Sequence, residues 1–232
     1  MSGSRRAAVV VALGLVAVTA GCLGVLTGSE PLAFAANGTV VEDAALRDAG
    51  YEEGEHRTIG RTFNASVGGG TRQVTIRNEL YRYNRTVPAG SLTTGNGSAG
   101  TGVPTNRSGA APSVSGAAQF AVLSSPDASV AGQSVNPLAD LSARELVERF
   151  SVSNAVRNLT FDGNRSVRIL GQRRTVSAFR AEATGIGPAT RVRVHVTSFE
   201  HEGDLVVAIA VHPELLDERD RVDRLLGGLK RT

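Results

Sequence analysis

The alternation of hydrophobic and polar positions predicts a β-hairpin in the first half of the chain. Residues 57–67 and 71–86 flank three consecutive glycines, and the second segment has apolar side chains at every other position, which is typical of a half-buried strand. The parity of the apolar positions changes between Ile76 and Tyr81, so we expect a bulge or twist near Asn78.

The second half of the chain is expected to consist mainly of strands joined by short turns. Valines alternate with arginines in one segment, a continuous apolar run forms another, and Glu200–Asp204 reads as the hairpin turn between them. The expected strands are 117–123, 166–171, 176–183, 191–196 and 205–211.

Three segments predict helices. Thr39–Glu42 and Ser142–Glu145 have the spacing of a capping box, and Gly50 would end the first helix. Glu214–Leu229 carries apolar residues at helical spacing, with acidic residues early and basic residues late. Strands with short turns and two or three separate helices predict an α+β fold, a twisted antiparallel sheet with the helices packed on one face.

A segment rich in Gly, Ser, Thr, Ala and Pro interrupts this pattern at 88–116, where Arg107 is the one charged residue. Such a composition buries too little apolar surface to order itself. Neither flank alone has enough apolar residues for a core, so we interpret the segment as a flexible insertion within a single domain spanning 32–232.

The first residues have the pattern of an export signal. Two arginines precede the uncharged stretch 7–20, and small residues lead to Cys22. The sequence Val18–Cys22 resembles a lipobox, in which cleavage before the cysteine is followed by lipidation of its thiol. We therefore expect a signal peptide at 1–21, cleavage between Gly21 and Cys22, and a lipid-anchored tether at 22–31.

An uncleaved transmembrane anchor is the alternative, because residues 7–26 carry no charge and a helix of that length spans a bilayer of about 30 Å. Lipidation is favoured because the chain's only cysteine, Cys22, falls where this chemistry requires it. Both forms place the arginines inside and the domain on the outer face of the cytoplasmic membrane. The export route stays open, since Ser4–Arg6 resembles a twin-arginine signal while general secretion fits equally.

Glycosylation sequons are unusually frequent. Of ten asparagines, seven begin an Asn-x-Ser/Thr triplet, whereas the 37 Ser and Thr residues would give about 1.6 by chance. This excess favours an extracellular glycoprotein, and the alternative is that turn-rich loops are simply rich in these residues. The candidate sites are Asn37, Asn64, Asn84, Asn96, Asn106, Asn158 and Asn164.

The charge balance gives no support to nucleic-acid binding. The chain has 25 Lys and Arg against 22 Asp and Glu, and cleavage of the signal would leave it near +1. Several arginines share the first predicted hairpin, where a solvated sheet surface is the favoured interpretation and a face for anionic headgroups or acidic polysaccharide is the alternative. They are Arg57, Arg61, Arg72, Arg77, Arg82 and Arg85.

No residue pattern predicts catalysis or a cofactor. The nearest candidate is the last hairpin, which could bring His195 close to His212 at the end away from its turn. A zinc or copper site needs three or four ligands, and the carboxylates of this hairpin lie at the turn instead. We therefore expect no metal site, and an envelope metal-binding protein or enzyme that uses these histidines is the alternative.

The order of features along the chain resembles an uncharacterised family of haloarchaeal lipoproteins. The segments that carry the resemblance are Gly21–Glu30, Ala49–Glu52, Phe120–Pro126, Asn136–Pro137, Glu145–Leu146 and Val206–Pro213 before a terminal helix. The ending also resembles that of PsbP-like α+β lipoproteins. The first resemblance implies an archaeal, exported, lipid-anchored cell-envelope protein and no catalytic residues. We expect a non-enzymatic binding or accessory protein, with a subunit of a membrane complex as a further alternative and with ligand, partner and oligomeric state open.

Overall fold

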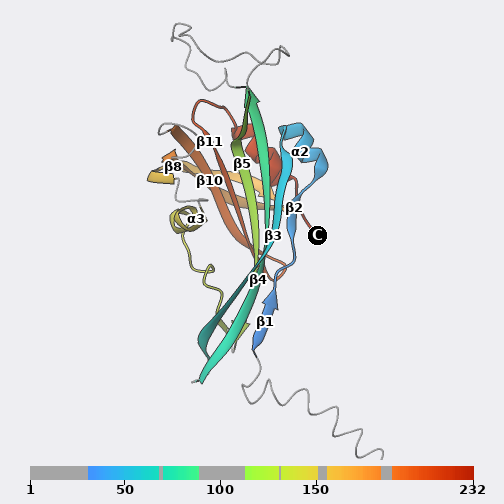
Figure 1. Cartoon of the computed structure of the whole chain (residues 1–232), viewed down its shortest axis with the longest axis vertical. Coiled ribbons are helices and arrows are strands. Elements are labelled where there is room, and N and C mark those ends of the chain that lie inside the picture. Colours follow the sequence, from blue (N-terminus) through green and yellow to red (C-terminus); the bar gives the residue numbers. More distant parts are fainter. Residues whose placement is uncertain (1–30, 68–69, 89–112, 131, 151–155, 184–189) are drawn as a thin grey trace, which may run out of the picture.

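The structure is a computed structural model of the 232-residue chain, and it describes residues 31–67, 70–88, 113–130, 132–150, 156–183 and 190–232. Most of these residues belong to one large mixed sheet (Figure 1). Its longer strands are β3 (Glu52–Val67), β4 (Gly70–Pro88), β5 (Ser113–Pro126), β8 (Val156–Ile169), β9 (Gln172–Ala183), β10 (Thr190–His201) and β11 (Asp204–Pro213).

The strand order is β1-β4-β5-β11-β10-β9-β8, with β3 paired to β4 as well. The short strand β1 (Leu32–Ala35) runs parallel to the first half of β4, and β5 runs antiparallel to its second half. Because β3 pairs with both halves of β4, it must occupy the opposite edge of that strand. The parallel β1–β4 pair makes the sheet mixed, not antiparallel as expected.

The predicted placement of all helices on one face is also wrong. Helices α2 (Asp43–Ala49) and α4 (Arg219–Gly227) pack on the sheet face that includes Val206, Ala208 and Ala210 of β11. Helix α3 (Ala143–Phe150) packs on the other face, against the alternate residues of the same strand. The continuous apolar run of β11 is therefore a strand buried on both faces, and the fold is mostly β instead of α+β.

The first predicted hairpin is confirmed, since β3 and β4 pair antiparallel along their length. The bulge expected near Asn78 is wrong, because the register shifts at Glu53/Glu55 and at Arg85/Val87 instead. The change of parity reflects a change of the buried face: Tyr81 packs on the side of α2 and α4, whereas Leu80 packs on the side of α3.

Two hairpin turns are built from pairs of residues with positive φ. Glu202 (φ 48°) and Gly203 (φ 80°) join β10 to β11, which confirms and narrows the turn expected at Glu200–Asp204. Leu170 (φ 46°) and Gly171 (φ 78°) join β8 to β9 in the same way. Two-residue turns of this kind match the right-handed twist of the strands they connect.

The helix ends follow the predictions in part. The Ser142 capping box is confirmed, because Ser142 N donates to Glu145 Oε2 at 2.8 Å and Glu145 N donates to Ser142 Oγ at 3.3 Å. Gly50 ends α2 in the left-handed conformation, as expected. Thr39 caps no helix, because it lies in strand β2 (Thr39–Val41).

The terminal helix is shorter than predicted. Strand β12 (Leu229–Arg231) takes the last apolar position of the expected helix and pairs with β2. Residues 214–218 form the connection that precedes α4. A small hairpin of β6 (Ser129–Val130) and β7 (Gln133–Ser134) lies between β5 and α3.

The described residues include no helix that is long and apolar enough to cross a membrane. The predicted signal peptide, Cys22 and most of the predicted insertion lie outside the described residues. The two strands that flank the insertion pair with each other up to Pro88 and Ser113.

Candidate functional site

His195 of β10 and His212 of β11 are in contact at the end of their hairpin away from the turn. Their Nε2 atoms are 3.1 Å apart, and both side chains are buried. The register pairs His195 with Ala210 and His212 with Arg193, so the two rings meet diagonally on one sheet face. The prediction that this hairpin brings the two histidines together is confirmed.

The hydrogen bonds around the two rings fix one arrangement of protons. Arg165 of β8 can only donate, so His195 Nδ1, 2.9 Å from its guanidinium, must accept. His195 then carries its proton on Nε2 and donates to Nε2 of His212. The remaining proton of His212, on Nδ1, is donated to the Pro213 carbonyl at 2.9 Å. All four ring nitrogens thus have partners within the protein.

Arg165 is itself held in place by α4. Its Nε and one terminal nitrogen donate to Asp223 Oδ1 at 2.9 and 2.7 Å. Arg165 of β8 therefore links Asp223 of α4 to the histidine pair. Sequence reasoning missed both residues, because Arg165 lies 30 positions before His195 and 58 before Asp223 with no local motif that joins them.

Burial and positive neighbours keep both histidines neutral. Burial, followed by Arg165, His212 and Arg193, lowers the pKa of His195 to about 3. Burial also lowers the pKa of His212, against the opposing effect of its bond to the Pro213 carbonyl. At neutral pH both histidines are therefore uncharged. Neither carries the extra proton of an imidazolium, and no ring nitrogen has a lone pair without a hydrogen-bond partner.

The histidine pair forms one wall of a pocket of about 260 Å³, which we call the β11–α4 pocket. The connection 214–218 and Arg219, the first residue of α4, also line it. Charged side chains of both signs line it, namely Arg193, Glu214, Asp217, Glu218 and Arg219. The volume is slightly below that of typical small-molecule sites, so the pocket suits a small polar molecule.

Glu218 is a buried carboxylate in this pocket, with 2% of its surface exposed. Its Oε2 accepts from the Tyr51 hydroxyl at 3.2 Å, and its Oε1 pairs with Arg85 and with Arg221. Burial raises the pKa of Glu218, and Arg85 and Arg221 oppose that rise. Burial and this carboxylate together raise the pKa of Tyr51 far above its usual value.

Sequence reasoning missed this buried network too. Arg85 and Glu218 are 133 positions apart, and Tyr51 and Glu218 are 167 apart. In the sequence Glu218 is one of several acidic residues in a predicted amphipathic helix, and nothing marks it as buried.

The other two histidines lie elsewhere. His56 Nε2 is 2.6 Å from Glu79 Oε2 on the β3–β4 hairpin, and His201 is 3.9 Å from Glu202 at the β10–β11 turn. Among the residues that the structure describes, no three His, Cys, Asp or Glu side chains are grouped so that they could hold a metal ion. His195 and His212, the two histidines of the alternative metal site, are therefore in contact, but the described residues supply no third ligand.

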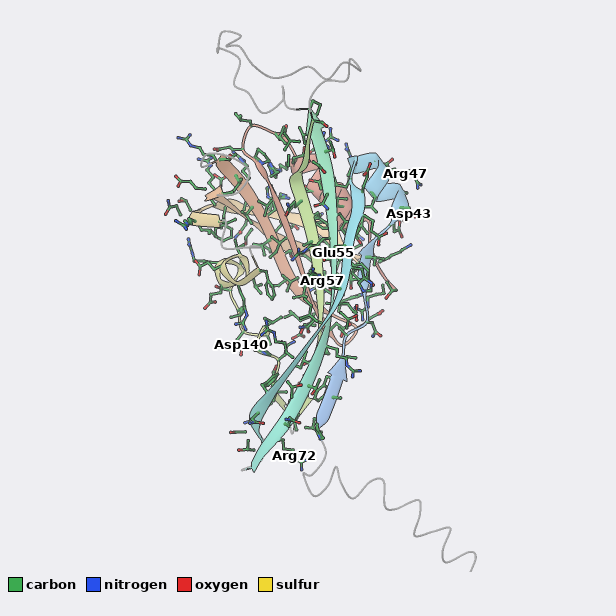
Figure 2. All side chains as sticks on the ribbon, viewed as in Figure 1. Asp43, Arg47, Glu55, Arg57, Arg72 and Asp140 are labelled. Atoms are coloured by element: carbon green, nitrogen blue, oxygen red, sulfur yellow. The ribbon has the colours of Figure 1, made fainter. Side chains whose placement is uncertain are left out.

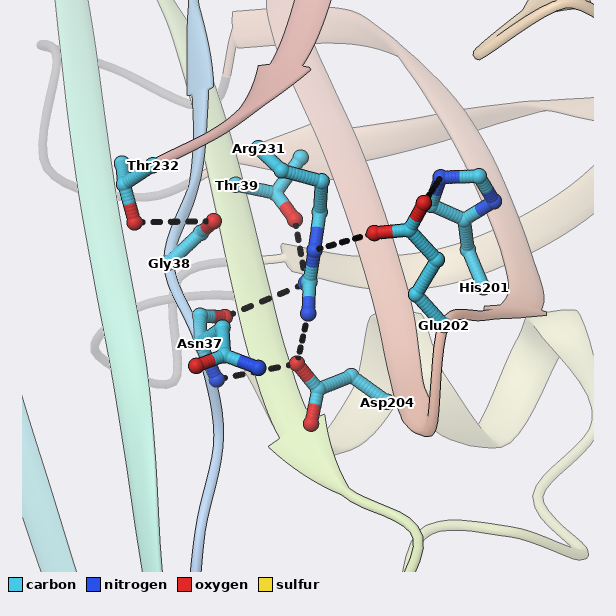
Figure 3. A network of polar contacts seen from close by, with 8 residues as sticks. All are labelled: Asn37, Gly38, Thr39, His201, Glu202, Asp204, Arg231 and Thr232. Carbon is cyan, nitrogen blue, oxygen red and sulfur yellow. Dashed lines mark hydrogen bonds and ion pairs between the residues drawn. The ribbon is translucent and has the colours of Figure 1, made fainter.

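The carboxylates at the β10–β11 turn belong to a polar network that joins both ends of the described chain (Figure 3). Asp204, which is 2% exposed, pairs with Arg231 and accepts from the Asn37 backbone N–H at 2.9 Å. Arg231 also donates to Thr39 Oγ1 at 3.1 Å, and the Thr232 N–H donates to the Gly38 carbonyl at 3.0 Å. We call Asn37, Gly38, Thr39, Asp204, Arg231 and Thr232 the terminal clamp.

Five of the seven sequons lie in the described residues. Asn37, Asn64, Asn158 and Asn164 are exposed, and Asn84 is half-buried. The Thr39 side chain of the Asn37 sequon is engaged in the terminal clamp. Asn96 and Asn106, like Gly21 and Cys22, lie outside the described part of the chain, so glycosylation and lipidation stay predictions.

Comparison with known proteins identifies the family but not the activity. No curated protein matches the chain. One family model matches residues 38–230, which include the histidine pair, Glu218 and half of the terminal clamp, namely Gly38, Thr39 and Asp204. Its description, a domain of unknown function, agrees with the expectation of an uncharacterised family. The chain is therefore a member of the DUF6517 family, a domain family of unknown function.

Proposed function

We propose that this protein is an exported, lipid-anchored member of the cell envelope that binds a small polar ligand as a non-enzymatic binding or accessory protein. Cys22 would carry the lipid, and the domain would lie on the outer face of the cytoplasmic membrane. The observation that carries the proposal is the distance between two parts of the domain. One is β1, the first strand that the structure describes, and the other is the β11–α4 pocket.

The strand register measures that separation. Next to His212, Val211 pairs with Gln119, and Gln119 pairs with Asn84 of β4. Strand β1 pairs with β4 around Ile76, eight positions earlier. At about 3.3 Å per residue the pocket and β1 are about 25 Å apart along the sheet. An anchor that precedes β1 would hold the domain at one end and leave the pocket toward the other.

The pocket supports binding better than catalysis. All four ring nitrogens of its two histidines have hydrogen-bond partners within the protein. Neither histidine is therefore available to accept a proton from a bound molecule. Arg219 and Asp217 are exposed at the pocket and can contact a ligand. Charges of both signs suit a small ligand that is zwitterionic or strongly polar.

Replacing Cys22 by Ser tests the anchor. We expect the wild-type protein to stay with membranes and to carry the added mass of a lipid, and the Cys22→Ser variant to lack both properties. Retention of both proteins in the membrane, each at the mass of its unprocessed chain, would refute lipidation and support the transmembrane anchor instead.

The pocket has its own test, which is independent of the anchor. Arg219→Gln should weaken binding of a small zwitterion such as an amino acid or betaine, whereas Arg224→Gln, which replaces another exposed arginine of α4, should not. Equal binding by both variants in calorimetry would rule out the pocket as the binding site.

A further inference from the structure

The end of the β3–β4 hairpin that lies next to β1 differs in charge from the rest of the hairpin. We call residues 59–67 of β3 and 70–77 of β4 the arm. The arm contains three arginines, Arg61, Arg72 and Arg77, and no acidic residue. The remainder of the same hairpin is mixed, with Glu52, Glu53, Glu55 and Glu79 among its arginines. In Figure 2, Arg72 lies near the tip of the arm, and Glu55 and Arg57 lie well away from it.

The arm has a small apolar core of its own. Val74 and Ile76 of β4 are buried against Ala128, and Phe63 of β3 and Phe34 of β1 pack on them. Ala128 and Val135 pack on the arm, and the segment 127–135 that carries them adds one carboxylate, Asp127, which accepts from Ser129 Oγ at 3.1 Å. The arm and this segment together therefore keep an excess of two positive charges.

The direction of β1 relative to the arm follows from its pairing with β4. β1 is parallel to β4, and Leu32 pairs with Val74, four positions after the first residue of β4 at the tip. Following β1 backward from Leu32 therefore leads toward the tip (Figure 1). Leu32 is level with a point about 13 Å from the tip at about 3.3 Å per residue.

The tether is long enough to let the tip reach a membrane. Cys22 precedes Leu32 by ten positions, which span at most about 35 Å when fully extended. A lipid on Cys22 would thus hold the arm, with Arg72 near its tip and Arg61 and Arg77 about 20 Å from that tip, within reach of the headgroups. A single acyl chain binds a bilayer only weakly, and nearby basic residues are a common second signal.

We propose that the arm is a membrane-contact surface that binds anionic phospholipid headgroups beside the lipid anchor. This inference rests on the proposed anchor at Cys22. Each arginine close to an anionic surface contributes about 1 kcal/mol, or about fivefold in affinity, so three arginines give about 100-fold. The contact would also fix which end of the domain faces the membrane.

The test uses the full, lipidated chain in vesicles of phosphatidylcholine with or without phosphatidylglycerol. A fluorophore on Thr71→Cys, an exposed site at the tip, reports proximity to a headgroup-bound quencher. The chain is produced without N-glycosylation, because a glycan on Asn64 would also lie on the arm. We expect strong quenching on anionic vesicles, weak quenching on neutral ones, and loss of the difference in 1 M salt, where the screening length is about 3 Å.

Replacing the three arm arginines by Gln should abolish this difference and reduce retention on anionic vesicles by about 100-fold. A matched variant with Arg157, Arg173 and Arg191 replaced by Gln removes the same charge from exposed sites on β8 to β10 and should behave as wild type. If the Arg72 change unfolds the arm, the pair Arg61→Gln and Arg77→Gln, both exposed positions, carries the test with about a 25-fold effect.

Quenching that is equal on both vesicles, or unchanged in the arm variant, would overturn the membrane-contact role while leaving the anchor intact. A chain that carries no lipid and leaves both kinds of vesicle would overturn the anchor and, with it, the arm contact.

Discussion

At the scale of single residues, the two buried histidines make the stability of the protein depend on pH. Both have lowered pKa values, that of His195 to about 3. In the unfolded chain each titrates near pH 6.5. The folded state therefore keeps its full stability above about pH 6.5 and loses it as the pH falls toward the folded pKa, because only the unfolded chain takes up the protons.

We expect the free energy of unfolding to fall by roughly 1 kcal/mol per pH unit through His195 between about pH 6 and 5, with a further decrease through His212, in a window above the usual titration of carboxylates. Urea denaturation at several pH values measures this slope. A variant with His195→Gln and His212→Gln should have a flatter profile. A flat wild-type profile would mean that the pair is not buried and neutral.

We expect the negative charge of Glu218 to contribute strongly to the stability of the protein. Glu218→Gln leaves Arg85 and Arg221 facing an uncharged group, and breaking a buried ion pair costs about 3–5 kcal/mol. Asp220→Asn removes an exposed acid two positions later, in α4, and should cost less than about 0.5 kcal/mol. Thermal unfolding of the two variants checks this, and equal melting temperatures would show that Glu218 is solvated.

At the scale of elements, α2 and α4 approach each other closely at a glycine. A Cβ on Gly228 would fall well inside van der Waals contact of the Ala45 Cβ, whereas a Cβ on Gly227 would meet nothing closer than the Arg168 carbonyl at 3.8 Å. The pair of adjacent glycines therefore offers a matched comparison of packing.

We expect Gly228→Ala to destabilise the protein by about 1–3 kcal/mol through overpacking, and Gly227→Ala to be neutral or slightly stabilising. Chemical denaturation distinguishes the two. A Gly228→Ala variant as stable as wild type would show that α2 and α4 do not pack at this distance.

Local pattern predicted the strands well, because alternation and turn residues act over a few positions. It also brought His195 and His212 together, since a hairpin register follows from its turn. It failed where distant segments decide the outcome: Thr39 has the spacing of a helix cap, but pairing of β2 with β12 and a bond from Arg231 draw it into a strand. The faces covered by the helices were missed for the same reason.

At the scale of the whole molecule, the terminal clamp joins the start of the domain, its last strand and the β10–β11 turn. Arg231→Ala would leave Asp204 buried without its cation, which should cost about 3 kcal/mol. Lys230→Ala, a change at the exposed neighbouring position, should cost less than about 0.5 kcal/mol.

Hydrogen exchange shows which strands lose stability when the clamp is broken. In the Arg231→Ala variant, amides of β2 and β12 should lose protection before those of β9 and β10, because the clamp contacts the β2–β12 pair and not the central sheet. Uniform loss of protection would show instead that the clamp stabilises the whole sheet.

The proposed arrangement of the whole molecule begins with a lipid on Cys22, continues through the arm beside the membrane and ends with the pocket at the distal side of the sheet. The intact mass of the protein purified from membranes tests the lipid anchor, on which the rest of this arrangement depends. After enzymatic or chemical removal of any N-glycans, we expect the mass of residues 22–232 plus a lipid on Cys22. The 24.1 kDa mass of the complete 232-residue chain, with no adduct, would contradict it.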